Sequence, residues 1–260
     1  MAPFNGVPTH SQQVVLALMP KLAATLSLAG SGYIVFDCFR RRRKTKDQNT
    51  YHRLMIGLSV CDLLMSAGLF TSTWPMPKET PHVWGAVGTV ESCEAIGFLE
   101  QAGVIATMYN GSLSTYNLLR IRYGWTSSQI SRVEPWMHAI PFIFGLATMI
   151  ASLKLNLFNS GLFDCWVAPF PQGCQESWRN NGETTCERGD NASLYQWLFD
   201  LIPKWASILL VTINMVMTHQ AVYRQERGAL RFSFPHMVRI RSENGQQEGL
   251  VFPFTTLTVF

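Results

Sequence analysis

The stretch LMIGLSVCDLLMSAGLFTSTW, residues 54–74, decides the fold class. It contains a single charged side chain, Asp62, and no proline. A helix needs about 20 apolar residues to cross the hydrocarbon core of a bilayer, which is roughly 30 Å thick. A surface helix of a soluble bundle would instead carry a polar face along its length. Because this stretch has no charged face, we predict a membrane-spanning helix.

Four further stretches share this character, namely residues 14–39, 95–119, 136–157 and 195–220. Charged residues make up 15% of the 260-residue chain, compared with about 25% of a typical soluble domain. They gather between the stretches rather than within them. The sequence therefore predicts an all-α membrane helix bundle with five spans over residues 14–231. A short N-terminal segment, 1–13, precedes it, and residues 232–260 are expected to form a disordered tail.

Basic residues predict how the bundle is oriented, because loops that stay in the cytoplasm retain Lys and Arg. They follow the first, third and fifth predicted spans. The side so marked carries Arg40, Arg41, Arg42, Arg43, Lys44, Lys46, Arg53, Arg120, Arg122, Arg132, Arg224, Arg227, Arg231, Arg239 and Arg241. We therefore expect an extracellular N-terminus, a plasma-membrane location and a cytoplasmic C-terminal tail.

Four cysteines fall on the predicted outer side, where oxidation is allowed: Cys93, Cys165, Cys174 and Cys186. Four cysteines permit three pairings, and sequence alone does not choose among them. We favour Cys93–Cys165, which would hold the outer loop over the bundle, with Cys174–Cys186 closing a smaller loop. The same loop carries the sequon Asn191-Ala192-Ser193, a candidate glycosylation site.

Asp62 lies near the middle of the second predicted span. Ionisable groups at membrane depth are costly and usually face the bundle interior. One interpretation is an ion or proton site coupled to conformation. The other is a hydrogen-bond hub that joins polar neighbours such as Ser31, Asn110 or Asn214. The sequence leaves both open.

Glu100 lies about 10 Å below Cys93 along a helix, a depth that suits a ligand pocket open to the outside. With Gln101, Asp200 and Lys204 it forms a candidate ligand site, and its carboxylate could pair with a cationic ligand. A salt bridge to Lys21 or Lys204 is the alternative that we favour slightly. Asp200 and Lys204 are four residues apart on one helical face and are expected to pair with each other.

No catalytic or metal-ligating motif occurs among the residues: HExxH, GxSxG, Walker and CxxC patterns are all missing. The sequence therefore predicts a protein that is not an enzyme and uses no cofactor or metal. The basic residues follow membrane topology, so they do not indicate nucleic-acid binding. The lipid bilayer is the first expected partner.

Several short motifs, taken together, resemble those of G-protein-coupled receptors. They are LSVCDL at residues 58–63, GSGYIV at 30–35, Cys93, Cys165-Trp166, and LSTYNLL at 113–119 with the following Arg122-Tyr123. The Cys-Trp pair and the last motif are most similar to cyclic-AMP-receptor-like and secretin-like receptors. The Asp-Arg-Tyr triplet of rhodopsin-like receptors is missing, so its mechanism cannot be transferred.

This resemblance implies a receptor that senses a small molecule or short peptide outside the cell and signals to a heterotrimeric G protein. Receptor dimers are a further expectation. The resemblance implies seven helices where five are predicted, so we expect a truncated receptor. Candidate G-protein-facing residues are Arg120, Arg122, Tyr123, Arg224 and Arg227.

Two other function classes stay open from the sequence. A small transporter or channel could use Asp62 and Glu100 to line a polar path, although no internal repeat supports it. A retinal-binding light sensor would need a lysine deep in a late helix, and Lys154 and Lys204 lie toward the outer ends of their spans.

Overall fold

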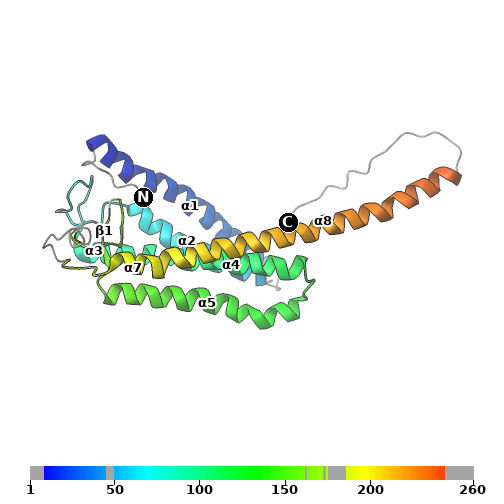
Figure 1. Ribbon diagram of the computed structural model, residues 1–260. Coiled ribbons are helices and arrows are strands. Elements are labelled where there is room, and N and C mark those ends of the chain that lie inside the picture. Colours follow the sequence, from blue (N-terminus) through cyan, green and yellow to red (C-terminus); the bar gives the residue numbers. More distant parts are fainter. Residues whose placement is uncertain (1–8, 45–49, 162, 172–173, 175–185, 244–260) are drawn as a thin grey trace. The chain divides into compact units, whose positions relative to one another are not determined.

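A computed structural model describes residues 9–44, 50–161, 163–171, 174 and 186–243. In this part the chain is a bundle of helices with one two-stranded sheet (Figure 1), which confirms the predicted fold class. The chain divides into two compact units, residues 1–218 and 219–260. In chain order the elements are α1 (His10–Lys44), α2 (Thr50–Thr71), α3 (Val90–Glu100), α4 (Ala102–Ile121), α5 (Ser127–Lys154), β1 (Phe158–Ser160), β2 (Cys165–Val167), α7 (Ala192–Gln196), η1 (Trp197–Leu201) and α8 (Ile202–Glu243).

Four stretches of helix in the described chain are long and apolar enough to cross a membrane: His10–Arg40, Thr50–Thr71, Ser127–Lys154 and Ala192–Gly228. Their outward faces carry large apolar side chains that water would not solvate favourably. Among the most exposed are Leu22, Leu26, Phe36, Trp136, Ile143 and Leu209. Since these faces need an apolar surrounding, the chain is an integral membrane protein.

The third predicted span is interrupted rather than continuous. Helix α3 ends at Glu100 and α4 begins at Ala102, with Gln101 between them in a helical backbone conformation. The Gln101 amide still donates to the Gly97 carbonyl, 3.1 Å away, so the chain keeps its direction. The interruption therefore marks a change in local hydrogen bonding, at a residue whose side chain is completely buried.

Pro203 explains the irregular start of the last span. Proline has no amide hydrogen, so the carbonyl of Phe199, four residues earlier, loses its α-helical partner. Here the turn widens into the π-helical segment η1, in which the Ile202 amide bonds to the Trp197 carbonyl. The carbonyl that Pro203 frees therefore lies within a π-helical turn.

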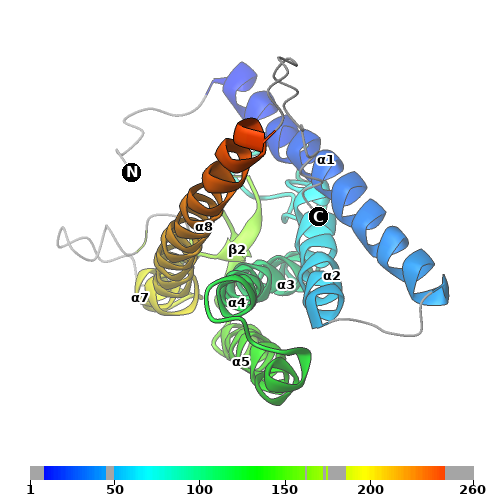
Figure 2. The ribbon, with the colours of Figure 1, turned by 90° about the vertical axis from the view of Figure 1, so that its right-hand side faces the viewer.

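Helix α4 is the central element of the first unit. It packs between α2 and α5, and α1 packs on α2 (Figure 2). Polar side chains also join α4 to α8. Ser207 donates to the Thr107 carbonyl over 2.7 Å, and the Asn214 amide lies 3.0 Å from the hydroxyls of both Ser114 and Thr115. Each hydrogen bond satisfies a polar group that would otherwise lie unpaired in an apolar interior.

Two predicted helix boundaries differ from the structure: the start of the fourth span and the start of the C-terminal tail. Helix α5 begins well before residue 136, since Thr126 and Gln129 form a reciprocal N-terminal capping box. The predicted disordered tail begins inside a helix, because α8 continues to Glu243. Residues 224–231, RQERGALR, are rich in good helix formers. The rest of that tail, 244–260, and residues 1–8 of the N-terminal segment lie outside the described residues.

Gly145 offers a test of the contact between α4 and α5. A Cβ added at Gly145 would overlap Ile105 Cγ1, whereas a Cβ added at Gly30 on α1 would meet nothing within 4 Å. We expect Gly145→Ala to lower the free energy of unfolding by about 1–3 kcal/mol through overpacking. Thermal unfolding of the chain in nanodiscs measures this. Gly30→Ala is the matched control, and an equal loss in both variants would contradict the packing.

Candidate functional site

A short hairpin covers one end of the first unit. Strands β1 and β2 pair antiparallel, with Asn159 opposite Trp166. A disulfide between Cys93 at the start of α3 and Cys165 in β2 ties the hairpin to the bundle. The second disulfide joins Cys174 and Cys186. The structure thus has the two pairings that we favoured from the sequence. We call this end of the first unit the disulfide end.

Polar contacts fasten the hairpin at two further points. Arg188 forms an ion pair with Glu94 of α3, and its Nε donates to Asn159 Oδ1 over 3.0 Å. Ser72, just after α2, donates to the Phe163 carbonyl over 2.9 Å. The hairpin is therefore held against α2 and α3, and its inner face is presented to the bundle.

Gln101 is the residue on which the hairpin and three helical segments meet. Its side-chain oxygen accepts from the Trp166 indole N–H over 2.9 Å. Its amide nitrogen lies 3.4 Å from the Phe199 carbonyl and 3.5 Å from Thr148 Oγ1. The Phe199 carbonyl is the one that Pro203 frees. Gln101 is 0% exposed, so these contacts satisfy a polar group that has no access to water.

Two of the other predicted ligand-site residues lie beside this hub. Lys204 pairs with Asp200 over 2.6 Å, as expected from their spacing. The Lys204 ammonium also lies 5.4 Å from the centre of the Trp166 ring. Trp166 therefore connects Gln101 with the Asp200–Lys204 pair. In the sequence, Trp166 belongs to the Cys-Trp motif, and it was not predicted to be a site residue.

Glu100 points to a different neighbour. Its Cγ lies 2.6 Å from where a Cβ at Gly68 of α2 would stand, and the side chain is 7% exposed. The salt bridge that we favoured from the sequence is not formed. Lys21 instead donates to the Thr71 carbonyl over 2.7 Å, and Lys204 is taken by Asp200. Glu100 Oε1 has no hydrogen-bond partner in the described part of the chain.

Asp164 in the hairpin turn adds a second carboxyl group to this region. Burial raises the pKa of Asp164 to about 6, while its own backbone hydrogen bond and the charge of Lys204 act in the opposite direction. The turn is closed by the Gly161 amide, which donates to the Asp164 carbonyl over 2.8 Å. The region beneath the hairpin thus holds more carboxyl groups than cations.

Asp62 is the centre of a separate cluster between α1 and α2. Its Oδ2 accepts from Ser31 and, over 2.8 Å, from Ser27, whose hydroxyl in turn accepts from Ser66 over 2.9 Å. Asn110 is not part of the cluster, since its amide donates to the Ala106 carbonyl of its own helix. Ser27 and Ser66 each lie one turn from Ser31 and Asp62, and that spacing could have predicted them.

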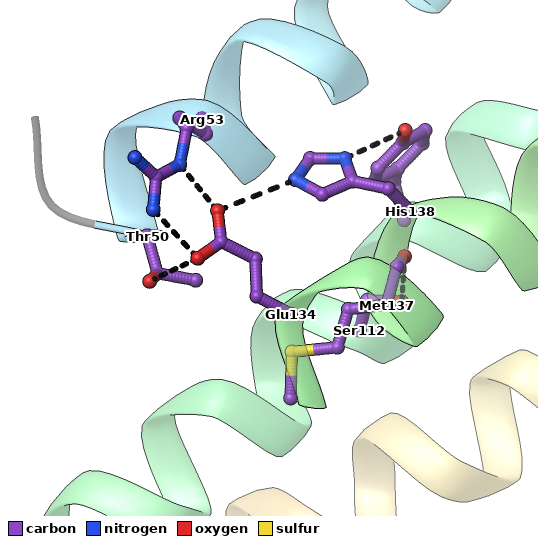
Figure 3. Close-up of polar contacts among 7 residues, drawn as sticks. Thr50, Arg53, Ser112, Glu134, Met137 and His138 are labelled. Carbon is purple, nitrogen blue, oxygen red and sulfur yellow. Dashed lines mark hydrogen bonds and ion pairs between the residues drawn. The ribbon is translucent and has the colours of Figure 1, made fainter. Parts of the chain in front are cut away.

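A third polar cluster joins α2, α4 and α5 (Figure 3). Glu134 of α5 is ion-paired with Arg53 of α2, and its carboxylate also accepts from Thr50. His138, one turn further along α5, contacts Tyr109 of α4. This cluster was not predicted, because the fourth span was expected to begin at residue 136, after Glu134. The capping box at Thr126 places Glu134 within the helix.

The predicted G-protein-facing residues are all exposed. Arg120, Arg122 and Tyr123 lie at the end of α4, where Arg120 donates to the Trp125 carbonyl and Arg122 to the Met217 carbonyl. In the second unit, Arg224 and Arg227 lie on α8, and the Arg227 guanidinium is 4.5 Å from the centre of the Tyr223 ring. Exposed basic groups of this kind can meet an acidic partner or lipid headgroups.

Asn191 is exposed and precedes α7, with a positive φ of 57°. Its amide side chain therefore lies at a turn on the surface of the disulfide end, and its modification stays a prediction. Among the described residues, no group of three or more His, Cys, Asp or Glu is arranged to hold a metal ion.

A membrane helix bundle with a disulfide-held hairpin above buried polar residues has the features of a receptor-like membrane protein. Two curated proteins support this class. Ascaroside receptor GPR3 of Arthrobotrys oligospora is 24% identical over 241 residues, covering 88% of this chain and 50% of that receptor. Ascaroside receptor GPR2 of the same organism is 23% identical over 217 residues, covering 78% of this chain and 44% of that receptor.

These similarities are distant, and they support a membrane protein similar to G-protein-coupled receptors. The chain spans about half the length of the curated relatives that it matches. No protein-family model matches the chain. The finer likeness to cyclic-AMP-receptor-like and secretin-like receptors stays a prediction.

The Gln101–Trp166 hydrogen bond can be tested by a double-mutant cycle. We expect Gln101→Leu to lower the free energy of unfolding by about 1–3 kcal/mol, because a buried indole N–H and carbonyl lose their partner. In a Trp166→Phe background the loss should be smaller, giving a coupling of about 0.5–3 kcal/mol. Thermal unfolding of the four proteins in nanodiscs measures it. Strictly additive losses would contradict the contact.

Asp164 predicts a pH dependence of stability. Its pKa is higher in the folded protein than in the unfolded chain, so its stabilising contribution is complete below about pH 4 and is lost as the pH rises through about 6. We expect Asp164→Asn to raise the free energy of unfolding at about pH 7.5 by about 1 kcal/mol. The gain should vanish near pH 4. Asp190→Asn, an exposed neighbour, is the control, and a pH-independent gain would contradict the assignment.

Proposed function

We propose that the chain is a receptor that senses an extracellular ligand at its disulfide end. It would signal to a heterotrimeric G protein through the basic residues that follow its first, third and fifth spans. The observation that carries this proposal is the buried polar region beneath the fastened hairpin. Gln101 and Lys204 contact Trp166 there, and Asp200 pairs with Lys204. Glu100, next to Gln101 in the chain, has an oxygen with no hydrogen-bond partner in the part of the chain that the structure describes. A soluble ligand would approach this region from the side of the hairpin.

Glu100 is the residue that we assign to the ligand. A buried carboxylate oxygen without a donor is unfavourable, and an incoming hydroxyl or ammonium group would satisfy it. Gln101 is already hydrogen-bonded to Trp166, and Asp200 is paired with Lys204. Their role would be to hold the walls of the site. The ligand should therefore bring hydrogen-bond donors, and its affinity should depend on Glu100.

The names of the two relatives suggest the ligand class. Both are called ascaroside receptors, and together they match most of this chain. We therefore propose an ascaroside as the first ligand to test, with other small molecules or short peptides as alternatives.

The G protein would bind at the opposite face of the membrane. Basic residues after the first, third and fifth spans support a cytoplasmic position for that face. The exposed Arg120, Arg122 and Tyr123 of α4 and Arg224 and Arg227 of α8 are the proposed G-protein contacts. An extracellular N-terminus, a plasma-membrane location and glycosylation of Asn191 follow from the same orientation.

Ligand binding can be tested on the full chain in nanodiscs by titration with an ascaroside. A ligand that binds only the folded state at about 100 times its Kd raises the free energy of unfolding by about 2.7 kcal/mol. We expect an upward shift of the thermal midpoint in the wild-type protein. Glu100→Gln keeps the shape of the side chain but weakens acceptance from a donor, so the shift should largely disappear.

Glu91→Gln on the same helix is the matched control, because Glu91 is exposed. It should retain the full shift. If an ascaroside leaves the thermal midpoint of the wild-type protein unchanged, the proposed ligand class is wrong. If the midpoint shifts equally in the wild-type and Glu100→Gln proteins, Glu100 does not contact the ligand.

A further inference from the structure

A cavity of about 360 Å³ lies between α4, α5 and the start of α8, and its volume is within the range of small-ligand sites. Its walls come from one segment of each helix: residues 108–115, 133–141 and 203–210. Three side chains that line it, Trp136, Ile140 and Leu210, are 67%, 56% and 44% exposed. Since these side chains belong to the apolar outer face of the bundle, the cavity is a groove that opens toward the bilayer. We call it the lipid-facing groove.

The hydroxyl groups in the walls of the groove already donate within the protein. Pro141 has no amide hydrogen, so the Met137 carbonyl one turn earlier loses its helical partner. The Ser112 hydroxyl donates to that carbonyl over 3.0 Å (Figure 3). The hydroxyls of Thr115 and Ser207 likewise donate to backbone carbonyls, over 2.9 and 2.7 Å. The groove therefore offers no hydroxyl donor to a polar ligand and favours a hydrocarbon chain.

The length of the groove is close to the depth of one leaflet of the bilayer. On α5 its wall runs from Val133 to Pro141, about 12 Å at 1.5 Å per residue. The hydrocarbon core is about 30 Å thick, so the acyl chains of one leaflet extend over about 15 Å. An acyl chain that lies parallel to the helices would therefore fill the groove along its length.

One face of α5 continues from the groove toward the headgroups. Arg132, Trp136 and Ile140 are spaced four residues apart, so they share a helical face, and all three are exposed. Going into the span, the face presents a cation, then an indole, then an apolar side chain. A phospholipid presents its groups in the matching order, with the charged phosphate outermost and the hydrocarbon innermost.

Arg132 is available to an anionic headgroup. The neighbouring carboxylate on α5, that of Glu134, is ion-paired with Arg53. Residues two apart also point to different faces of a helix. Among the residues that the structure describes, Arg132 has no ion-pair partner. The positive charge at this end of the groove is therefore not neutralised by the described part of the protein.

We propose that the lipid-facing groove binds one anionic phospholipid of the surrounding bilayer. An acyl chain of this lipid fills the groove between α4, α5 and α8, and its phosphate pairs with Arg132. The bound lipid thereby packs against three helices at once, which distinguishes it from the lipids that touch a single helix. The inference is independent of the proposed receptor ligand, because the groove opens to the bilayer and not to the disulfide end.

Two tryptophans allow a local measurement. Trp136 lines the groove, whereas Trp205 on α8 does not, and their exposed fractions are similar, 67% and 63%. The full chain is placed in phosphatidylcholine nanodiscs that contain a low fraction of phosphatidylglycerol brominated on its acyl chains, or of equally brominated phosphatidylcholine. Bromine quenches the fluorescence of a tryptophan that it contacts. The quenching of each tryptophan is obtained by difference from the Trp136→Phe and Trp205→Phe proteins.

The quantity compared is the ratio of quenching by phosphatidylglycerol to quenching by phosphatidylcholine at the same tryptophan, because this ratio cancels the depth of the ring. We expect a ratio of about five at Trp136, the effect of one cation beside an anionic headgroup. At Trp205 the ratio should be near one, since the adjacent Lys204 is paired with Asp200. A ratio near one at Trp136 as well would mean that ordinary annular lipid alone contacts the groove, and the proposal would be wrong.

Arg132→Gln tests the headgroup contact. It should bring the Trp136 ratio close to one, because the phosphate loses its cation. Lys154→Gln is the matched control, since Lys154 is an exposed cation on the same helix, about 33 Å away. It should leave the ratio unchanged. An Arg132→Gln protein that keeps the full ratio would contradict the pairing with the phosphate.

Ala206→Phe tests the acyl-chain contact by filling the groove from α8, where Ala206 is an exposed part of the wall. The selective quenching of Trp136 should disappear. Ala147→Phe makes the same change at an exposed position of α5 outside the groove and should have no effect. If the Ala206→Phe protein keeps the full ratio, the chain does not occupy the groove. The thermal midpoint of each variant checks that the bundle is folded, and Ala206→Leu replaces Ala206→Phe if it is not.

Discussion

The hydrocarbon core of a bilayer offers no water to polar groups, and this constraint organises the whole bundle. Each polar side chain at membrane depth has to find a partner within the protein. Asp62 meets serines of α1, Asn214 meets hydroxyls of α4, and Gln101 meets the indole of Trp166. The first two contacts lie between helices and the third joins a helix to the hairpin, so satisfying the polar groups also determines which elements lie side by side.

The same constraint connects a backbone defect to the disulfide end. Pro203 removes a donor from the last span, and the freed carbonyl of Phe199 is taken by Gln101 at the interruption between α3 and α4. Two irregular points in two helices therefore compensate each other, and the hairpin bonds to the same side chain through Trp166. The structure beneath the hairpin depends on one amide group. Glu100 differs, because its Oε1 has no hydrogen-bond partner among the residues that the structure describes.

Four of the five predicted spans correspond to helices long and apolar enough to cross a membrane, and the third is divided between α3 and α4. Two kinds of error arose. Helix ends were misplaced where local signals outweighed hydropathy, as at the Thr126 cap of α5, and α8 continues beyond the expected boundary at residue 231. Partners were misassigned where charge alone suggested them, as for Glu100 and Lys21. Opposite charges attract at any distance, whereas a contact requires two helix faces to meet, and a single sequence does not contain that geometry.

The sequence by itself determined the membrane spans, the cysteines available for disulfides and the pairing of Asp200 with Lys204. Each of these depends on local composition or on residues one helical turn apart. Tertiary structure alone decided that Gln101 joins the hairpin to the last span and that Arg53, Glu134, His138 and Tyr109 form one cluster. The reason is physical: those contacts depend on how helices from distant parts of the chain pack, and packing is a property of shape.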